Sequence, residues 1–66
     1  MSSDYYKHPN GIVEDGAEIG HGTKIWAWAH ILNNVRVGSN CNICDHTFIE
    51  NGVVIGDRVY IRIEAR

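Results

Sequence analysis

Hydrophobic side chains recur at every sixth position from Val13 onward. The chain can be cut there into nine blocks of six, in which the first residue is always Ile or Val and the fifth is always small or β-branched. The first positions are Val13, Ile19, Ile25, Ile31, Val37, Ile43, Ile49, Ile55 and Ile61. A helix repeats near 3.6 residues and a flat strand at 2, so neither explains this spacing. The period instead predicts a coil of short strands joined by corners.

The same pattern predicts how the coil closes. Each block supplies one short strand and one corner, and three blocks make a triangular turn of about eighteen residues, so that residue n stacks on residue n+18. The aliphatic and small positions both point inward, because a narrow prism accepts only small partners near its corners. Strands are therefore expected at residues 12–13, 18–19, 24–25 and at every sixth residue thereafter. No helix is predicted.

Gly, Asn, Asp and Ser fill the predicted corners, where they tolerate unusual φ values or form local hydrogen bonds. The second position of the block reads Gly20, Gly38 and Gly56 along one edge of the coil. We expect these glycines to supply a positive φ at the corner. Asn10-Gly11 is expected to form the turn into the first strand.

The period divides the chain into an N-terminal lead-in, residues 1–12, and one repeat domain, residues 13–66. Residues 1–7 are polar and aromatic and lie outside the period, so a loose conformation is expected there. A repeat that stops after about three coils leaves strand edges that need a cover. We therefore expect the domain to be truncated at its C-terminus. Such a short chain also buries little surface alone, which favours partner subunits.

The opening of the chain carries a family resemblance. It contains the runs Tyr5-Tyr6-Lys7-His8-Pro9, Ile12-Val13, Gly16-Ala17, Ile19-Gly20, Gly22-Thr23-Lys24-Ile25-Trp26 and Ala29-His30-Ile31. Together with the six-residue pattern, these runs resemble the hexapeptide-repeat nucleotide-sugar N-acetyltransferases. Residues 41–51 are most similar to a subgroup that is sometimes fused to a sugar 3,4-ketoisomerase domain. The resemblance covers nearly the whole chain, but only the front of a typical family member.

This resemblance implies a fold and a function. The implied fold is all-β: a left-handed parallel β-helix of hexapeptide repeats with about three coils. The implied enzyme transfers an acetyl group from acetyl-CoA to the amine of a dTDP- or UDP-linked 3-amino sugar, in bacterial surface polysaccharide biosynthesis, and works as a homotrimer. Two alternatives stay open: a non-catalytic β-helix module or remnant that only trimerises, and an O-acetyltransferase of the same repeat class.

Composition narrows the class of partner. The net charge is −2 and the basic residues are scattered, so no nucleic-acid partner is expected. No apolar run approaches the roughly 20 residues that span a bilayer, and no apolar signal-peptide core is present. The expected location is therefore cytoplasmic, without membrane association.

Cys41 and Cys44 form a C-x-x-C pair that alone suggests a metal or redox site. The period places Cys41 inside and Cys44 outside, and one pair falls short of the four ligands of structural zinc. No metal is expected.

Outward polar residues gather on two neighbouring faces of the predicted coil and on the corner between them. Acetyl transfer to an amine needs a group that accepts the ammonium proton, a donor for the carbonyl oxygen and a polar wall that holds the sugar. The catalytic candidates are Asp45 and His46, and the substrate-binding candidates are Trp28, His30, Asn33, Glu50 and Asn51. The alternative is that these residues form surface hydrogen bonds or subunit contacts. The outward aromatic residues Trp26, Trp28, Phe48 and Tyr60 favour such an interface.

Overall fold

The computed structural model describes residues 4–62, which form ten strands of two residues each and no helix. The strands are β1 (Tyr6–Lys7), β2 (Ile12–Val13), β3 (Glu18–Ile19), β4 (Lys24–Ile25), β5 (His30–Ile31), β6 (Arg36–Val37), β7 (Asn42–Ile43), β8 (Phe48–Ile49), β9 (Val54–Ile55) and β10 (Tyr60–Ile61). From β2 onward, every strand lies where the period predicts it. Within residues 4–62 there is likewise no apolar helix of bilayer-spanning length.

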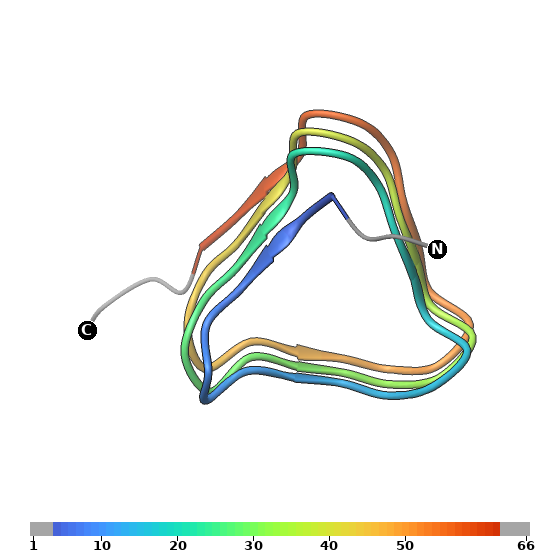
Figure 1. Cartoon of the computed structure of the whole chain (residues 1–66). Helices are drawn as coiled ribbons and strands as arrows, with labels where there is room; N and C mark the ends of the chain where they lie inside the picture. Colours follow the sequence, from blue (N-terminus) through green and yellow to red (C-terminus); the bar gives the residue numbers. More distant parts are fainter. Residues whose placement is uncertain (1–3, 63–66) are drawn as a thin grey trace.

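The strands form three parallel sheets, one on each side of a triangular coil (Figure 1). The sheet orders are β1-β4-β7-β10, β2-β5-β8 and β3-β6-β9. Partners in each sheet differ by eighteen residues, as in the pairs of Ile43 with Ile25 and with Ile61. The predicted stack of about three coils is confirmed, whereas its left-handed sense stays an expectation from the resemblance.

The core is the inside of this prism. Ile25, Ile31 and Ile43 are fully buried, while Val13 and Ile61, in the end coils, are only partly buried and pack against the core. The small positions from Thr23 to Thr47 are buried as well, whereas Val53 and Val59 are exposed. Thr23 shows how a polar group is accommodated at such a position. Its hydroxyl donates to the Gly38 carbonyl oxygen at 2.7 Å and accepts the Cys41 N–H at 3.2 Å. Its burial therefore leaves no hydrogen-bonding group unpaired.

The loose conformation expected before residue 8 is wrong for Tyr6 and Lys7. These residues form β1 and pair with β4, in the register that the period would give them. Lys7 occupies the inward position that an aliphatic residue fills elsewhere, and its Nζ donates to the Gly11 carbonyl oxygen at 2.9 Å. A lysine is tolerated there because its amino group lies at the open end of the prism. The turn that follows is centred on Pro9 and Asn10, one residue earlier than expected.

Positive φ values occur at the fourth position of the block and not at the second. The residues concerned are Gly16, Gly22, Trp28, Asn34, Asn40, His46, Gly52 and Arg58. The expected positive φ at Gly20, Gly38 and Gly56 is therefore wrong. Glycine is needed at Gly20 and Gly38 because the coils approach closely there: a Cβ on Gly20 would lie 2.5 Å from the Gly38 carbonyl carbon.

Candidate functional site

The first group of candidate residues lies on the corner that follows β4 and β7. In that corner Trp28 and His46 occupy the same place in successive coils, with φ values of 65° and 63°. Bulky side chains rarely adopt this left-handed conformation. Backbone bonds hold both residues in it, because the Trp28 N–H donates to the Asn10 carbonyl and the His46 N–H to the Ala27 carbonyl, each at 3.1 Å. The corner thus presents two large side chains at positions that glycine or asparagine would fill with less strain.

The side chains of Asp45 and His46 contact each other at this corner. The Asp45 Oδ2 lies 3.2 Å from the His46 Nδ1, within hydrogen-bonding distance. Both side chains are largely exposed, at 59% and 64%. Such an exposed pair adds little to stability, but a carboxylate on Nδ1 leaves Nε2 of a neutral imidazole as the proton acceptor.

A second group lies on the face formed by β2, β5 and β8. The His30 Nε2 is 2.8 Å from the Glu14 Oε2, and its ring contacts Phe48 edge-on at a centroid distance of 5.5 Å. The other Glu14 carboxylate oxygen accepts the Asn33 backbone N–H at 3.1 Å. Glu14 therefore links the first coil to the second and fixes the ring of His30. Glu14 was not among the predicted site residues. The stacking by eighteen places it next to His30 and Asn33 of the following coil, and this placement could have identified it.

Glu50 and Asn51 lie at the corner after β8 and are exposed. Asn51 is five positions after His46, which at about 3.3 Å per residue allows at most roughly 16 Å between their backbones. Because β8 runs along one side of the triangle between them, the predicted residues do not converge on one point. They form one group at the Trp28 corner, a second around His30 on the face of β2, β5 and β8, and a third at the next corner, where Asn33 and Asn51 occupy the same place in successive coils.

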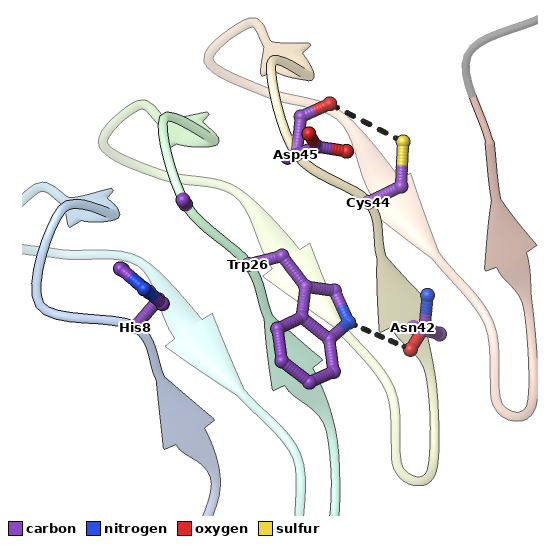
Figure 2. Close-up of a pocket in the computed structure, with 6 residues that line it drawn as sticks. His8, Trp26, Asn42, Cys44 and Asp45 are labelled. Carbon is purple, nitrogen blue, oxygen red and sulfur yellow. Dashed lines mark hydrogen bonds between the residues drawn. The ribbon is translucent and has the colours of Figure 1, made fainter.

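A shallow hollow of about 370 Å³ lies on the face of β4 and β7 (Figure 2). Its lining is His8, Trp26, Ala27, Asn42, Cys44 and Asp45. The Trp26 Nε1–H donates to the Asn42 Oδ1 at 2.9 Å, and the Tyr6 ring lies 5.4 Å from the Trp26 ring. Of the candidate residues only Asp45 lines this hollow. Stacking by eighteen puts His8, Trp26 and Cys44 in one column, a signal in the sequence that the site prediction did not use.

The two cysteines occupy the places that the period gives them. Cys41 is buried and its Sγ donates to the Gly56 carbonyl oxygen at 3.0 Å, whereas Cys44 is partly exposed and its Sγ donates to the Asp45 carbonyl oxygen at 3.3 Å. Residues 4–62 contain no group of three or more His, Cys, Asp or Glu side chains arranged to hold a metal ion.

Comparisons with known proteins agree with this architecture. Residues 16–51 match the family described as bacterial transferase hexapeptide (six repeats). Over 43 residues the chain is 52% identical to a dTDP-3-amino-3,6-dideoxy-alpha-D-galactopyranose 3-N-acetyltransferase of Aneurinibacillus thermoaerophilus, a match that covers 65% of this chain and 22% of the relative. Over 49 residues it is 29% identical to acyl-[acyl-carrier-protein]--UDP-N-acetylglucosamine O-acyltransferases of Brucella ovis and Brucella canis, covering 74% of this chain and 18% of each relative.

The chain thus spans about a fifth of the length of these curated relatives. No solved structure matches it significantly.

Proposed function

The chain belongs to the bacterial transferase hexapeptide family, and we propose that it is, or is part of, an acetyl-CoA-dependent N-acetyltransferase acting on a dTDP- or UDP-linked 3-amino sugar. The observation that carries this proposal is the 52% identity to a 3-N-acetyltransferase of a dTDP-linked 3-amino sugar. The proposed setting is bacterial surface polysaccharide biosynthesis in the cytoplasm.

The proposed reaction exchanges a thioester for an amide. The neutral sugar amine attacks the acetyl carbonyl carbon of acetyl-CoA, a C–N bond forms and the C–S bond breaks. One proton leaves the nitrogen, and the departing CoA sulfur takes one up. A protein group that accepts the first proton contributes typically 10²- to 10⁴-fold to such a rate.

In this scheme His46 accepts the proton and Asp45 positions its imidazole. Their 3.2 Å contact supports the assignment, because the carboxylate on Nδ1 turns Nε2 outward as the acceptor. The exposure of both side chains leaves room for a sugar amine to approach. Trp28, one coil away at the same corner, would cover the apolar face of the sugar.

The other candidate residues would hold the substrate further along the coil. His30, fixed by Glu14, lies on the next face, and Asn33, Glu50 and Asn51 follow at the next corner. Asn51 is the proposed amide donor to the carbonyl oxygen. Because these groups are spread along one side of the prism and its two corners, we propose a homotrimer in which neighbouring copies complete each site. The exposure of Trp28, Phe48 and Tyr60 supports such an interface.

O-acyl transfer is the second candidate function. Its support is the 29% identity, over 74% of this chain, to enzymes whose names specify an acyl-carrier-protein donor and a UDP-N-acetylglucosamine acceptor. This reaction would replace the attacking amine by a hydroxyl and CoA by a carrier protein.

A transfer assay on the purified protein separates these functions. Release of CoA thiol would be followed with dTDP- and UDP-linked 3-amino sugars, with the corresponding hydroxyl sugars, and with acyl carrier protein as the other donor. Acetylation of the amines supports the proposal, and a preference for a hydroxyl acceptor rejects it. A folded trimer that binds no acetyl-CoA in calorimetry indicates the non-catalytic module instead.

Two matched variants test the proposed base. Asp45→Asn weakens the contact with His46, and Asp15→Asn makes the same change at the first position of another exposed corner. We expect the first to lower turnover at least about tenfold and the second to leave it unchanged. Equal turnover in the two variants would remove Asp45 from the mechanism.

A further inference from the structure

We propose that the hollow beside Trp26 binds the 2,4-dioxopyrimidine base, uracil or thymine, of a nucleotide-linked substrate (Figure 2). This inference rests on the proposed function for the presence of a pyrimidine nucleotide. The placement of the base comes from the groups that line the hollow.

Trp26 provides a fixed aromatic surface. Its indole N–H is committed to the Asn42 Oδ1 at 2.9 Å, and the Tyr6 ring packs against it at 5.4 Å with an interplanar angle of 56°. The ring therefore keeps its orientation while about a third of the residue, 36%, remains exposed. A base that stacks on such a preorganised ring binds without first ordering it.

Asn42 presents hydrogen-bond donors to the hollow. The indole N–H can only donate, so the Asn42 atom that it contacts is the carbonyl oxygen, and the amide orientation is thereby assigned. The Asn42 Nδ2 keeps two N–H groups that make no hydrogen bond to other side chains or backbone among residues 4–62. Carbonyl oxygens are their natural partners.

His8 adds a donor on the other side of the Trp26 ring. Its Nδ1 accepts the Asn10 backbone N–H at 3.0 Å, so the proton of the neutral ring is on Nε2. His8, Trp26 and Cys44 follow one another in successive coils along the hollow, as Figure 2 shows. Donors from His8 and Asn42 therefore flank the indole surface.

Asp45 supplies the acceptor. Its Oδ2 contacts His46, and its Oδ1 makes no hydrogen bond to residues 4–62. Two donors and one carboxylate match in number the two carbonyl groups and the N–H on the edge of uracil and thymine. Cytosine and adenine place a bare nitrogen at the equivalent position, where it would oppose the carboxylate and leave a lone pair without a donor.

The charge on this face fits the rest of a nucleotide. Lys24 points outward from β4 between Tyr6 and Asn42 and is exposed. It makes no ion pair with the residues that the structure describes. A phosphate attached to a base in the hollow would thus meet a free cation on the same face.

Titration with nucleoside monophosphates tests the inference. UMP, dTMP, CMP and AMP would each be added to the protein, and the shift of the Trp26 indole N–H resonance followed by NMR. We expect UMP and dTMP to bind with dissociation constants within about threefold of each other. CMP and AMP should bind at least about tenfold more weakly, since each opposes the carboxylate with an acceptor. Equal binding of all four, or a preference for AMP, would overturn the proposal, and the second result would identify the hollow as an adenosine site.

A matched pair of variants locates the contact. Asn42→Asp keeps an oxygen for the Trp26 N–H and removes the two donors, so UMP binding should fall at least about tenfold. Asn40→Asp makes the same change of charge on another edge of the coil and should leave UMP binding unchanged. Circular dichroism of both variants confirms that they fold. Unchanged UMP binding by folded Asn42→Asp would place the base elsewhere.

The two proposals fail in different ways. If the protein acetylates a nucleotide-linked amino sugar while UMP leaves the Trp26 resonance unmoved, only the placement of the base is wrong. If UMP binds at the hollow with the expected preference and no acyl acceptor is modified, the placement holds and the proposed transfer reaction is wrong.

Discussion

The glycine column at the second position of the block makes the fold sensitive to one methyl group. A Cβ on Gly38 would meet the Asp57 Oδ1, and it would lie 2.7 Å from the Gly56 carbonyl carbon and 2.8 Å from the Asp57 backbone nitrogen. Real Cβ atoms do not approach backbone so closely, so the coils must separate locally. Gly38→Ala therefore perturbs the stacking of two coils without changing charge or polarity.

The cost of Gly38→Ala follows from these contacts. Overpacking a close-packed interior costs about 1–3 kcal/mol. The Asp57 Oδ1 also accepts the Ser39 N–H at 2.8 Å, and displacing it removes a hydrogen bond worth about 1 kcal/mol. The expected loss is thus about 2–4 kcal/mol, a large part of the total stability of a small domain.

Gly56→Ala is the matched control, because Gly56 lies in the same column and no atom of residues 4–62 is within 4 Å of the added Cβ. Its φ is not positive either, so we expect a change within about 0.5 kcal/mol. Urea unfolding followed by circular dichroism, at one fixed protein concentration, gives both values. If Gly38→Ala unfolds at the same urea concentration as Gly56→Ala, close approach of the coils is not why glycine occupies this column.

Other substitutions address the corner, the core and the link between coils. Trp28→Gly relieves a positive φ of 65° and should raise the free energy of unfolding by about 1 kcal/mol in the same assay; a loss would show that the side chain stabilises the corner. Thr23→Val leaves a buried carbonyl and a buried N–H without their partner and should lower that free energy by about 1–3 kcal/mol, so an unchanged urea midpoint would contradict the described bonds. Glu14→Ala removes two bonds between coils and should cost about 1 kcal/mol. Its control, Glu18→Ala, breaks an exposed pair at 3.6 Å and should cost less than about 0.5 kcal/mol; equal costs would mean that the Glu14 bonds contribute no more than a surface pair.

The six-residue period was sufficient to predict the strands and their stacking. An inward aliphatic residue at a fixed interval constrains every block in the same way, so the register of Ile25, Ile43 and Ile61 followed from counting. The period did not predict that Lys7 would form a strand, because an aliphatic residue is expected at this position. An end coil has an open side, on which a charged residue can occupy an inward position. The period also led to the wrong reason for glycine at position 38. Gly38 is required because the next coil lies very close to it, and not because its φ is positive.

The candidate site was predicted only in part. The contact of Asp45 with His46 was expected only as the alternative to a catalytic role, a surface hydrogen bond, because neighbouring residues at a corner meet through local geometry alone. Sequence reasoning missed the link of Glu14 to His30 and the hollow beside Trp26. Both depend on how side chains of adjacent coils turn toward one another.

The sequence by itself determined that the chain forms a three-sided coil and which positions face its inside, because a coil of short strands returns an aliphatic residue to the interior at every sixth position. Only the tertiary structure decided which outward groups meet. Residues some sixteen to eighteen positions apart, such as Glu14 and His30 or Trp26 and Asn42, come into contact through corner conformations and side-chain rotamers. The period constrains neither of these.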